Sequence, residues 1–212
     1  MGRPLQVTGS SVSTVFTTNE GASSEAALLA KKGFRCVCER CVSNPIEDAP
    51  LGGWRCTRQA DGACKGCVPA GGTRCTDCGA EHALAVVARE AAEERWAAVV
   101  EAWSAVLVGG NYSGSLQEAA WDLLPSLDTF LDESAPSLCE THALRHRVKV
   151  LRSFAIACLP DAPIEVLVES LEDCLTDMRR HLAPSQPYLL FFQYRLAGAL
   201  ARQAAASRAA AA

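Results

Sequence analysis

The chain has 212 residues, about half of them apolar, and a formal net charge of −4 at pH 7. This length suffices for a helical domain with a small appended module, and the charge gives no support to a general nucleic-acid binder. No stretch approaches the roughly eighteen apolar residues of a membrane span, and residues 1–13 lack the apolar core of a signal peptide. We therefore expect a cytoplasmic or nuclear protein, whose eleven cysteines are metal ligands or buried thiols rather than disulfides.

The first predicted segment, residues 1–33, shows little periodic structure. A short strand is expected within residues 12–17. The sequence SSEAALLAKK at residues 23–32 predicts a short helix that ends at Gly33.

The second predicted segment, residues 34–80, is rich in cysteine and glycine and has almost no periodic apolar pattern. Such a segment cannot bury enough apolar surface to become ordered without cross-links. Thiolates bound to Zn²⁺ can supply them, because a structural zinc ion takes four soft ligands in a tetrahedron. The candidate zinc ligands are Cys36, Cys38, Cys41, Cys56, Cys64, Cys67, Cys75 and Cys78.

Two CxxC pairs, Cys64 with Cys67 and Cys75 with Cys78, form the stronger of two expected zinc sites. A tight turn within CxxC places both sulfur atoms on one side of the backbone, and two glycines between the pairs let the chain reverse. The interval between the pairs is shorter than in common zinc ribbons. Replacement of one of these four ligands by Cys56 is therefore an open alternative.

A CxCxxC motif, CVCERC at residues 36–41, supplies three ligands to the second expected site. A closed structural zinc site needs four protein ligands, so the fourth must come from elsewhere. Cys56 is the nearest candidate along the chain.

The third predicted segment, residues 83–206, has helical periodicity, with proline or glycine between its stretches. Five helices are predicted around Trp96–Leu107, Leu116–Leu131, Leu144–Cys158, Ile164–Met178 and Leu189–Leu200. Pro125 is expected to bend the second of them. Short connections favour antiparallel neighbours. The expected fold is mainly α: a small, irregular, zinc-stapled Cys-rich module followed by an antiparallel helical domain similar to tetratricopeptide (TPR) repeats.

Several other polar and sulfur-containing residues in the helical segment have ordinary structural interpretations. Isolated cysteines in helical patterns typically act as small buried apolar residues. They are Cys139, Cys158 and Cys174. His142 and His146 lie one helical turn apart, but only Cys139 stands near them as a further ligand, so a metal site there is not favoured. A basic run includes Arg145, Arg147, Lys149 and Arg152, and for it a solvated helix face is favoured over a nucleic-acid or acidic-peptide site.

The stretch GFRCVCERC at residues 33–41 resembles the post-SET segment of SET and MYND domain (SMYD-type) protein-lysine methyltransferases, in which an aromatic residue precedes CxCxRC. The run NPIE at residues 44–47 is similar to the Asp-Pro-Thr-Glu that follows in one branch of the family. That branch also has further cysteines, ending in CxxC, before a C-terminal domain of repeat-like helical hairpins. The resemblance covers most of the chain in the same order.

The resemblance implies roles for individual residues. Cys36, Cys38 and Cys41 match the post-SET zinc ligands, whose fourth partner lies in an Asn-His-Ser-Cys motif of the catalytic core. That motif does not occur in this sequence. Phe34 matches the aromatic residue that helps to cover the adenine of S-adenosylmethionine, the alternative being a hydrophobic plug over the zinc loop. Phe16 stands about where the family has a tyrosine that guides the substrate lysine.

The family would make this chain the zinc-binding C-terminal part of a protein-lysine (histone) N-methyltransferase, with a histone tail or another lysine-bearing protein as partner. Because the SET core is missing, we expect no catalytic residue and no methyl transfer by the chain itself. S-adenosylmethionine is then a cofactor only if a complete core exists upstream. The alternative is a non-enzymatic, zinc-binding, TPR-like scaffold for a peptide or protein. A zinc-finger adaptor of the ubiquitin system is disfavoured, because the cysteine segment lacks histidine.

Overall fold

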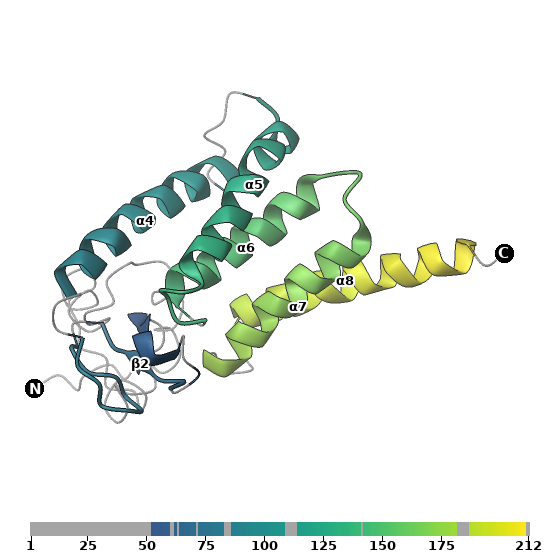
Figure 1. Cartoon of the computed structure of the whole chain (residues 1–212). Helices are drawn as coiled ribbons and strands as arrows, with labels where there is room; N and C mark the ends of the chain where they lie inside the picture. Colours follow the sequence, from purple (N-terminus) through teal and green to yellow (C-terminus); the bar gives the residue numbers. More distant parts are fainter. Residues whose placement is uncertain are drawn as a thin grey trace, which may run out of the picture. The chain divides into compact units, whose positions relative to one another are not determined.

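The computed structural model describes residues 52–59, 62, 64–70, 72–82, 86–108, 114–140, 142–181 and 187–210. The predictions for residues 1–33, and those for Phe34, Cys36, Cys38 and Cys41, lie outside the described residues. The elements are β1 (Trp54–Arg55), the 3-10 helix η2 (Thr57–Gln59), β2 (Cys67–Val68), α4 (Val86–Leu107), α5 (Leu116–Ser134), α6 (Ala143–Cys158), α7 (Ile164–His181) and α8 (Pro187–Ala210) (Figure 1). The mainly helical fold predicted from the sequence is confirmed, and the TPR-like repeat stays a prediction.

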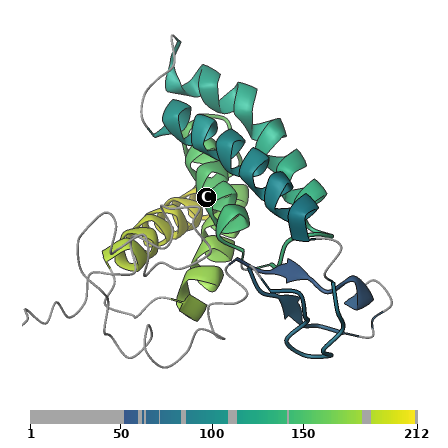
Figure 2. The ribbon, with the colours of Figure 1, turned by 90° about the vertical axis from the view of Figure 1, so that its left-hand side faces the viewer.

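The first of two compact units contains the Cys-rich chain up to residue 90 and, in addition, Ser137–Ala143 from the connection between α5 and α6. Its short strands β1 and β2 lie side by side and are antiparallel (Figure 2). On the other edge of β1, Trp54 forms an antiparallel bridge with Leu138. The Cys-rich module is thus extended by a stretch that lies far along the chain, which we call the returning stretch (Ser137–Ala143).

Three hydrogen bonds hold the returning stretch on β1. The Arg55 N–H donates to the Ser137 carbonyl at 2.8 Å, and the Cys139 N–H donates to the Gly53 carbonyl at 3.1 Å. The Arg55 side chain adds a bond from Nε to the Leu138 carbonyl at 3.1 Å. The sequence indicated only a break between two helices here, because a single bridge of this kind has no periodic pattern to reveal it.

The second unit comprises Ala91–Pro136 and the chain from Leu144 onward, and successive helices in it reverse direction (Figure 1). Trp96 and Trp103 of α4 contact the ring of Phe130 of α5 edge to face, with centroids 5.9 and 6.0 Å apart. Buried apolar side chains from all five helices form its core, as the periodicity predicted. They include Val100, Leu127, Phe130, Val148, Leu151, Leu171, Leu175, Met178 and Phe192. None of the described helices is both long enough and apolar enough to span a bilayer.

Helix α5 begins with a capping box at Ser115. The Ser115 hydroxyl accepts from the Glu118 N–H at 3.2 Å, and the Glu118 carboxylate accepts from the Ser115 N–H at 2.7 Å. These bonds satisfy two amides that have no partner within the helix. The helix then continues through Pro125 as far as Ser134, and the bend expected at Pro125 stays a prediction.

We expect Ser115→Ala to lower the free energy of unfolding by about 1 kcal/mol, because the cap loses its acceptor oxygen. Urea denaturation followed by circular dichroism would measure the change. Gln117→Ala, at an exposed position in the same helical turn, is the control and should change stability by less than about 0.5 kcal/mol. Equal effects of the two substitutions would show that the capping box contributes nothing specific.

Candidate metal centre

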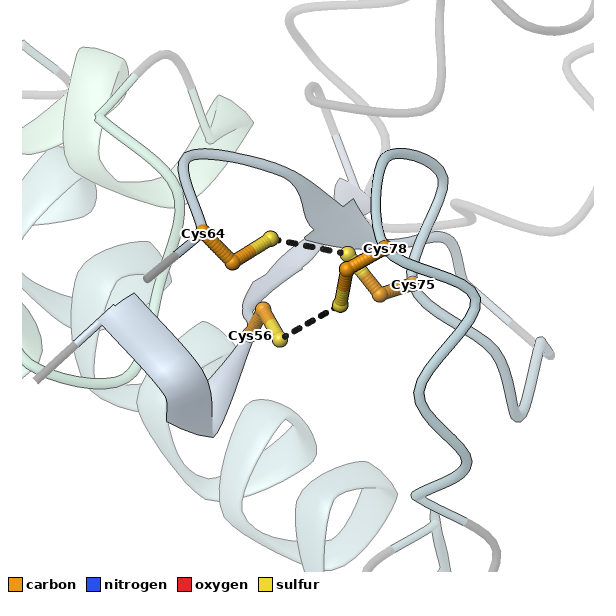
Figure 3. A group of neighbouring side chains, drawn as sticks. All are labelled: Cys56, Cys64, Cys75 and Cys78. Atoms are coloured by element: carbon orange, nitrogen blue, oxygen red, sulfur yellow. Dashed lines mark hydrogen bonds between the residues drawn. The ribbon is translucent and has the colours of Figure 1, made fainter. Parts of the chain in front are cut away.

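Four cysteine thiols converge in the first unit: Cys56, Cys64, Cys75 and Cys78 (Figure 3). Their sulfur atoms all lie within 4.8 Å of one another. The sulfurs of Cys56 and Cys78 are 3.7 Å apart, and those of Cys64 and Cys75 are 3.5 Å apart. Three of the side chains are buried and Cys78 is partly exposed. All four are free thiols, so this group, which we call the four-thiol cluster, could hold a metal ion.

The pairing of β1 with β2 decides which cysteines reach the four-thiol cluster. Arg55 lies opposite Cys67, and neighbouring residues on a strand point to opposite faces. Cys56 and Val68, each the next residue along, therefore share the other face, where both pack with Cys64 and Cys75. Cys67 is left on the face of Arg55, and there it contacts Cys139.

The structure therefore brings Cys56 to Cys64, Cys75 and Cys78, which was the open alternative in the sequence. Cys67, expected as the partner of Cys64 in a CxxC pair, lies outside the four-thiol cluster. The second CxxC pair does contribute both of its thiols. The difference arises because Cys67 belongs to a paired strand, whereas Cys75 and Cys78 are joined by a turn.

Two glycines shape the turns that present the thiols. The Gly66 N–H donates to the sulfur of Cys64 at 3.3 Å. A Cβ atom on Gly66 would lie 2.6 Å from the sulfur of Cys75, so no larger residue fits there without a shift of that sulfur. At the second turn, the Gly79 N–H donates to the Cys75 carbonyl at 3.1 Å, with φ of 67°, a conformation that glycine adopts at little cost.

His82 lies beside the four-thiol cluster and was not identified from the sequence. Its ring is buried, and Nε2 lies 3.5 Å from the sulfur of Cys56. The His82 N–H donates to the Thr73 carbonyl at 2.6 Å, which fixes the backbone after the second turn. When Nε2 carries the proton, it can donate to the Cys56 thiolate and stabilise the charged ligand. In the sequence, the only sign that His82 could lie near the thiols was its position four residues after Cys78.

The surroundings of the thiols set their protonation. Burial raises the pKa of Cys56. At Cys64 the hydrogen bond from Gly66 lowers the pKa, but burial and the neighbouring thiols outweigh it and raise the pKa to about 12. A hydrogen bond from the Ala80 backbone lowers the pKa of Cys78 to about 7 against the effect of burial. A metal ion binds the thiolate form of cysteine, so its binding to this cluster would release protons from the thiols.

The remaining described cysteines do not join the four-thiol cluster. Cys174 is buried in the second unit, with its sulfur 3.8 Å from the Ser153 hydroxyl, and Cys158 is partly exposed. Cys139 is buried as the sequence suggested, but its neighbour is the thiol of Cys67 rather than an apolar core.

Fold and cluster together define a mainly helical protein with a four-cysteine group that could hold a metal ion. No protein-family model, no curated protein and no solved structure matches the chain. The resemblance to SMYD-type methyltransferases therefore stays a prediction from the sequence motifs.

Proposed function

We propose that the four-thiol cluster binds one Zn²⁺ ion as a structural site. The observation that carries this proposal is the spacing of its sulfur atoms. Thiolates at the usual zinc–sulfur distance of about 2.3 Å stand about 3.8 Å apart at the corners of a tetrahedron. Two of the sulfur pairs are 3.7 and 3.5 Å apart. Four protein thiolates complete the coordination of zinc, so the proposed ion orders the first unit and has no open position for a substrate.

We expect the full chain to be purified with one tightly bound zinc ion in this site. Removal of the ion by a chelator should unfold residues 52–82, because formation of the site and ordering of the module are one event. Elemental analysis and limited proteolysis would measure the two changes, and re-addition of zinc should restore protease resistance. A metal-free protein with an equally resistant Cys-rich segment would refute the proposed site.

We further propose that the chain is the C-terminal part of a SMYD-type protein-lysine methyltransferase, acting on a histone tail or another protein in the cytoplasm or nucleus. The motif at residues 33–41 supports this, as does the order of a Cys-rich module followed by antiparallel helices. In this role Phe34 would lie beside the adenine of S-adenosylmethionine, and Cys36, Cys38 and Cys41 would form a second zinc site with a cysteine of the SET core.

We expect this polypeptide alone to transfer no methyl group, since the Asn-His-Ser-Cys motif that helps to bind the donor is not in the sequence. Incubation with radiolabelled S-adenosylmethionine and histone peptides would test this, with a complete SMYD-type enzyme as the positive control. Measurable turnover would contradict the prediction. Genomic sequence upstream of Met1 that encodes this motif and a GxG segment would support membership of the family.

The second candidate function is a non-enzymatic scaffold that binds a peptide or protein. Exposed aromatic side chains on α8 favour it, since such residues often contribute to protein interfaces. Tyr194 is 79% exposed and Phe191 is 43% exposed. The upstream sequence separates the two candidates, because a scaffold needs no methyltransferase motifs there.

A further inference from the structure

Cys67 and Cys139 form a second group of thiols, on the side of β1–β2 away from the four-thiol cluster. The two residues are 7% and 8% exposed and pack against each other. Cys67 lies on β2 and Cys139 on the returning stretch, so the pair exists only because that stretch docks on β1. Both are free thiols, and neither belongs to the four-thiol cluster.

A cavity of about 480 Å³ is lined by both thiols. Exposed side chains, Lys65 among them, also line it, so a small solute can enter from solvent. Arg55 is a second cation in the lining, and the Thr76 hydroxyl lies 3.9 Å from the sulfur of Cys67. Two carboxylates, Asp77 and Glu140, balance these two cations in the lining, and Cys64 of the four-thiol cluster lines the same cavity. The cavity thus places charged and hydroxyl groups of both kinds around the buried pair of thiols.

The contact between the two thiols makes them chemically unequal. A hydrogen bond from the Cys139 thiol lowers the pKa of Cys67 to about 7, although burial opposes this change. The same contact, together with burial, raises the pKa of Cys139. Cys67 is therefore the thiolate of the pair, and Cys139 is the proton donor beside it.

We propose that Cys67 and Cys139 are a redox-active pair that a hydroperoxide oxidises to a disulfide. The Cys67 thiolate attacks one peroxide oxygen, the O–O bond breaks, and the leaving hydroxide takes a proton to become water. Cys67 is then a sulfenic acid. The Cys139 sulfur attacks the sulfenic sulfur, the S–S bond forms, the S–O bond breaks, and a second water leaves after the Cys139 proton is taken up. In total, two thiols lose two electrons and one hydrogen peroxide becomes two waters.

The disulfide would join β2 covalently to the returning stretch. In the reduced protein that stretch is held on β1 by the three hydrogen bonds described above. Oxidation would therefore fasten the connection between α5 and α6 to the Cys-rich module without using a ligand of the four-thiol cluster. This inference goes beyond the proposed zinc site and does not depend on it.

Peptide mapping of the zinc-loaded full chain after one equivalent of hydrogen peroxide would test the pair. We expect a peptide linked through Cys67 and Cys139, the loss of two titratable thiols per chain and an unchanged zinc content. In Cys139→Ser, Cys67 should stop at the sulfenic acid and be trapped by dimedone. In Cys67→Ser, Cys139 should not be trapped. Cys158→Ser, at an isolated position, is the control and should form the linked peptide as the original protein does.

Zinc content before and after oxidation separates this inference from the zinc proposal. A protein without zinc that still forms the linked peptide supports the redox pair and refutes only the zinc site. Oxidation of other cysteines while Cys67 and Cys139 stay reduced would overturn the inference. Zinc release that precedes any change at Cys67 would overturn it as well, and circular dichroism of each variant would show that the fold is intact.

Discussion

Replacement of Cys56 by serine should abolish tight zinc binding, whereas the same replacement of Cys67 should leave one zinc ion per chain. The sulfur of Cys56 is one of the four that lie within 4.8 Å of one another. Cys67 lies on the other face of the β1–β2 pair and is not one of them. Loss of a residue that only hydrogen-bonds a metal ligand typically lowers metal affinity about 10- to 100-fold. We expect the loss of a ligand to exceed about 100-fold, and to unfold the Cys-rich module with it.

Titration against a chromophoric chelator would measure the affinity, and proteolysis would measure the order of residues 52–82. The two variants are matched, because both remove one buried thiol from the same unit. Equal zinc loss in Cys67→Ser and Cys56→Ser would mean that the site also needs Cys67, and that the four-thiol cluster alone does not define it. Retention of zinc by Cys56→Ser, with its loss from Cys67→Ser, would mean that the two CxxC pairs of the sequence define the site.

Sequence spacing identified the Cys-rich module but favoured Cys67 over Cys56 as a ligand, whereas the four-thiol cluster contains Cys56. The choice depends on which strand face each thiol occupies, and the pairing of two-residue strands sets that face. Strands this short have no apolar alternation from which a register could be read. The neighbours Cys139 and His82 were missed for a related reason: their positions follow from backbone contacts between segments that lack a motif.

The helices were easier to predict, because apolar periodicity is local and continues over several turns. The interior charges were not. The basic run on α6 was interpreted as a solvated face, yet Arg145 and Lys149 are buried, and this interpretation is wrong for them. Arg145 donates to the Leu131 carbonyl at 2.7 Å and to the Ser134 hydroxyl at 2.8 Å. Partners on neighbouring helices decide whether a cation can be buried, and the sequence of one helix does not reveal them.

Lys149 forms a buried ion pair with Asp177. Its Nζ is 2.7 Å from the Asp177 carboxylate and 3.1 Å from that of Asp173, and the side chains of Lys149 and Asp177 are only 9% and 3% exposed. His146 Nδ1 is 4.0 Å from the same Asp177 carboxylate. Burial opposes the charge on Lys149, but the two carboxylates outweigh it and raise the pKa of Lys149 above 10.5.

We expect Lys149→Met to lower the free energy of unfolding by about 3–5 kcal/mol, because the buried Asp177 carboxylate loses its ammonium partner. The double variant Lys149→Met/Asp177→Leu should recover part of this loss, since no buried carboxylate is then left. Glu101→Gln is the control, because it breaks the ion pair of Arg147 with Glu101, and the Glu101 side chain is 69% exposed. It should lower the free energy of unfolding by at most about 1 kcal/mol. Equal effects of Lys149→Met and Glu101→Gln would show that burial gives the Lys149 pair no special weight.

The pH dependence of stability gives this ion pair an independent signature. A pKa raised on folding means that the stabilisation by Lys149 is complete below about pH 10.5 and is lost as the pH rises through the folded-state value. Urea unfolding at pH 8 and above pH 10.5 would measure the loss in the original protein. Lys149→Met has no amine to titrate, so its stability should fall less over the same range. If the stability of both proteins falls equally at alkaline pH, other groups, such as exposed thiols and tyrosines, cause the fall. That result would contradict the expected contribution of Lys149.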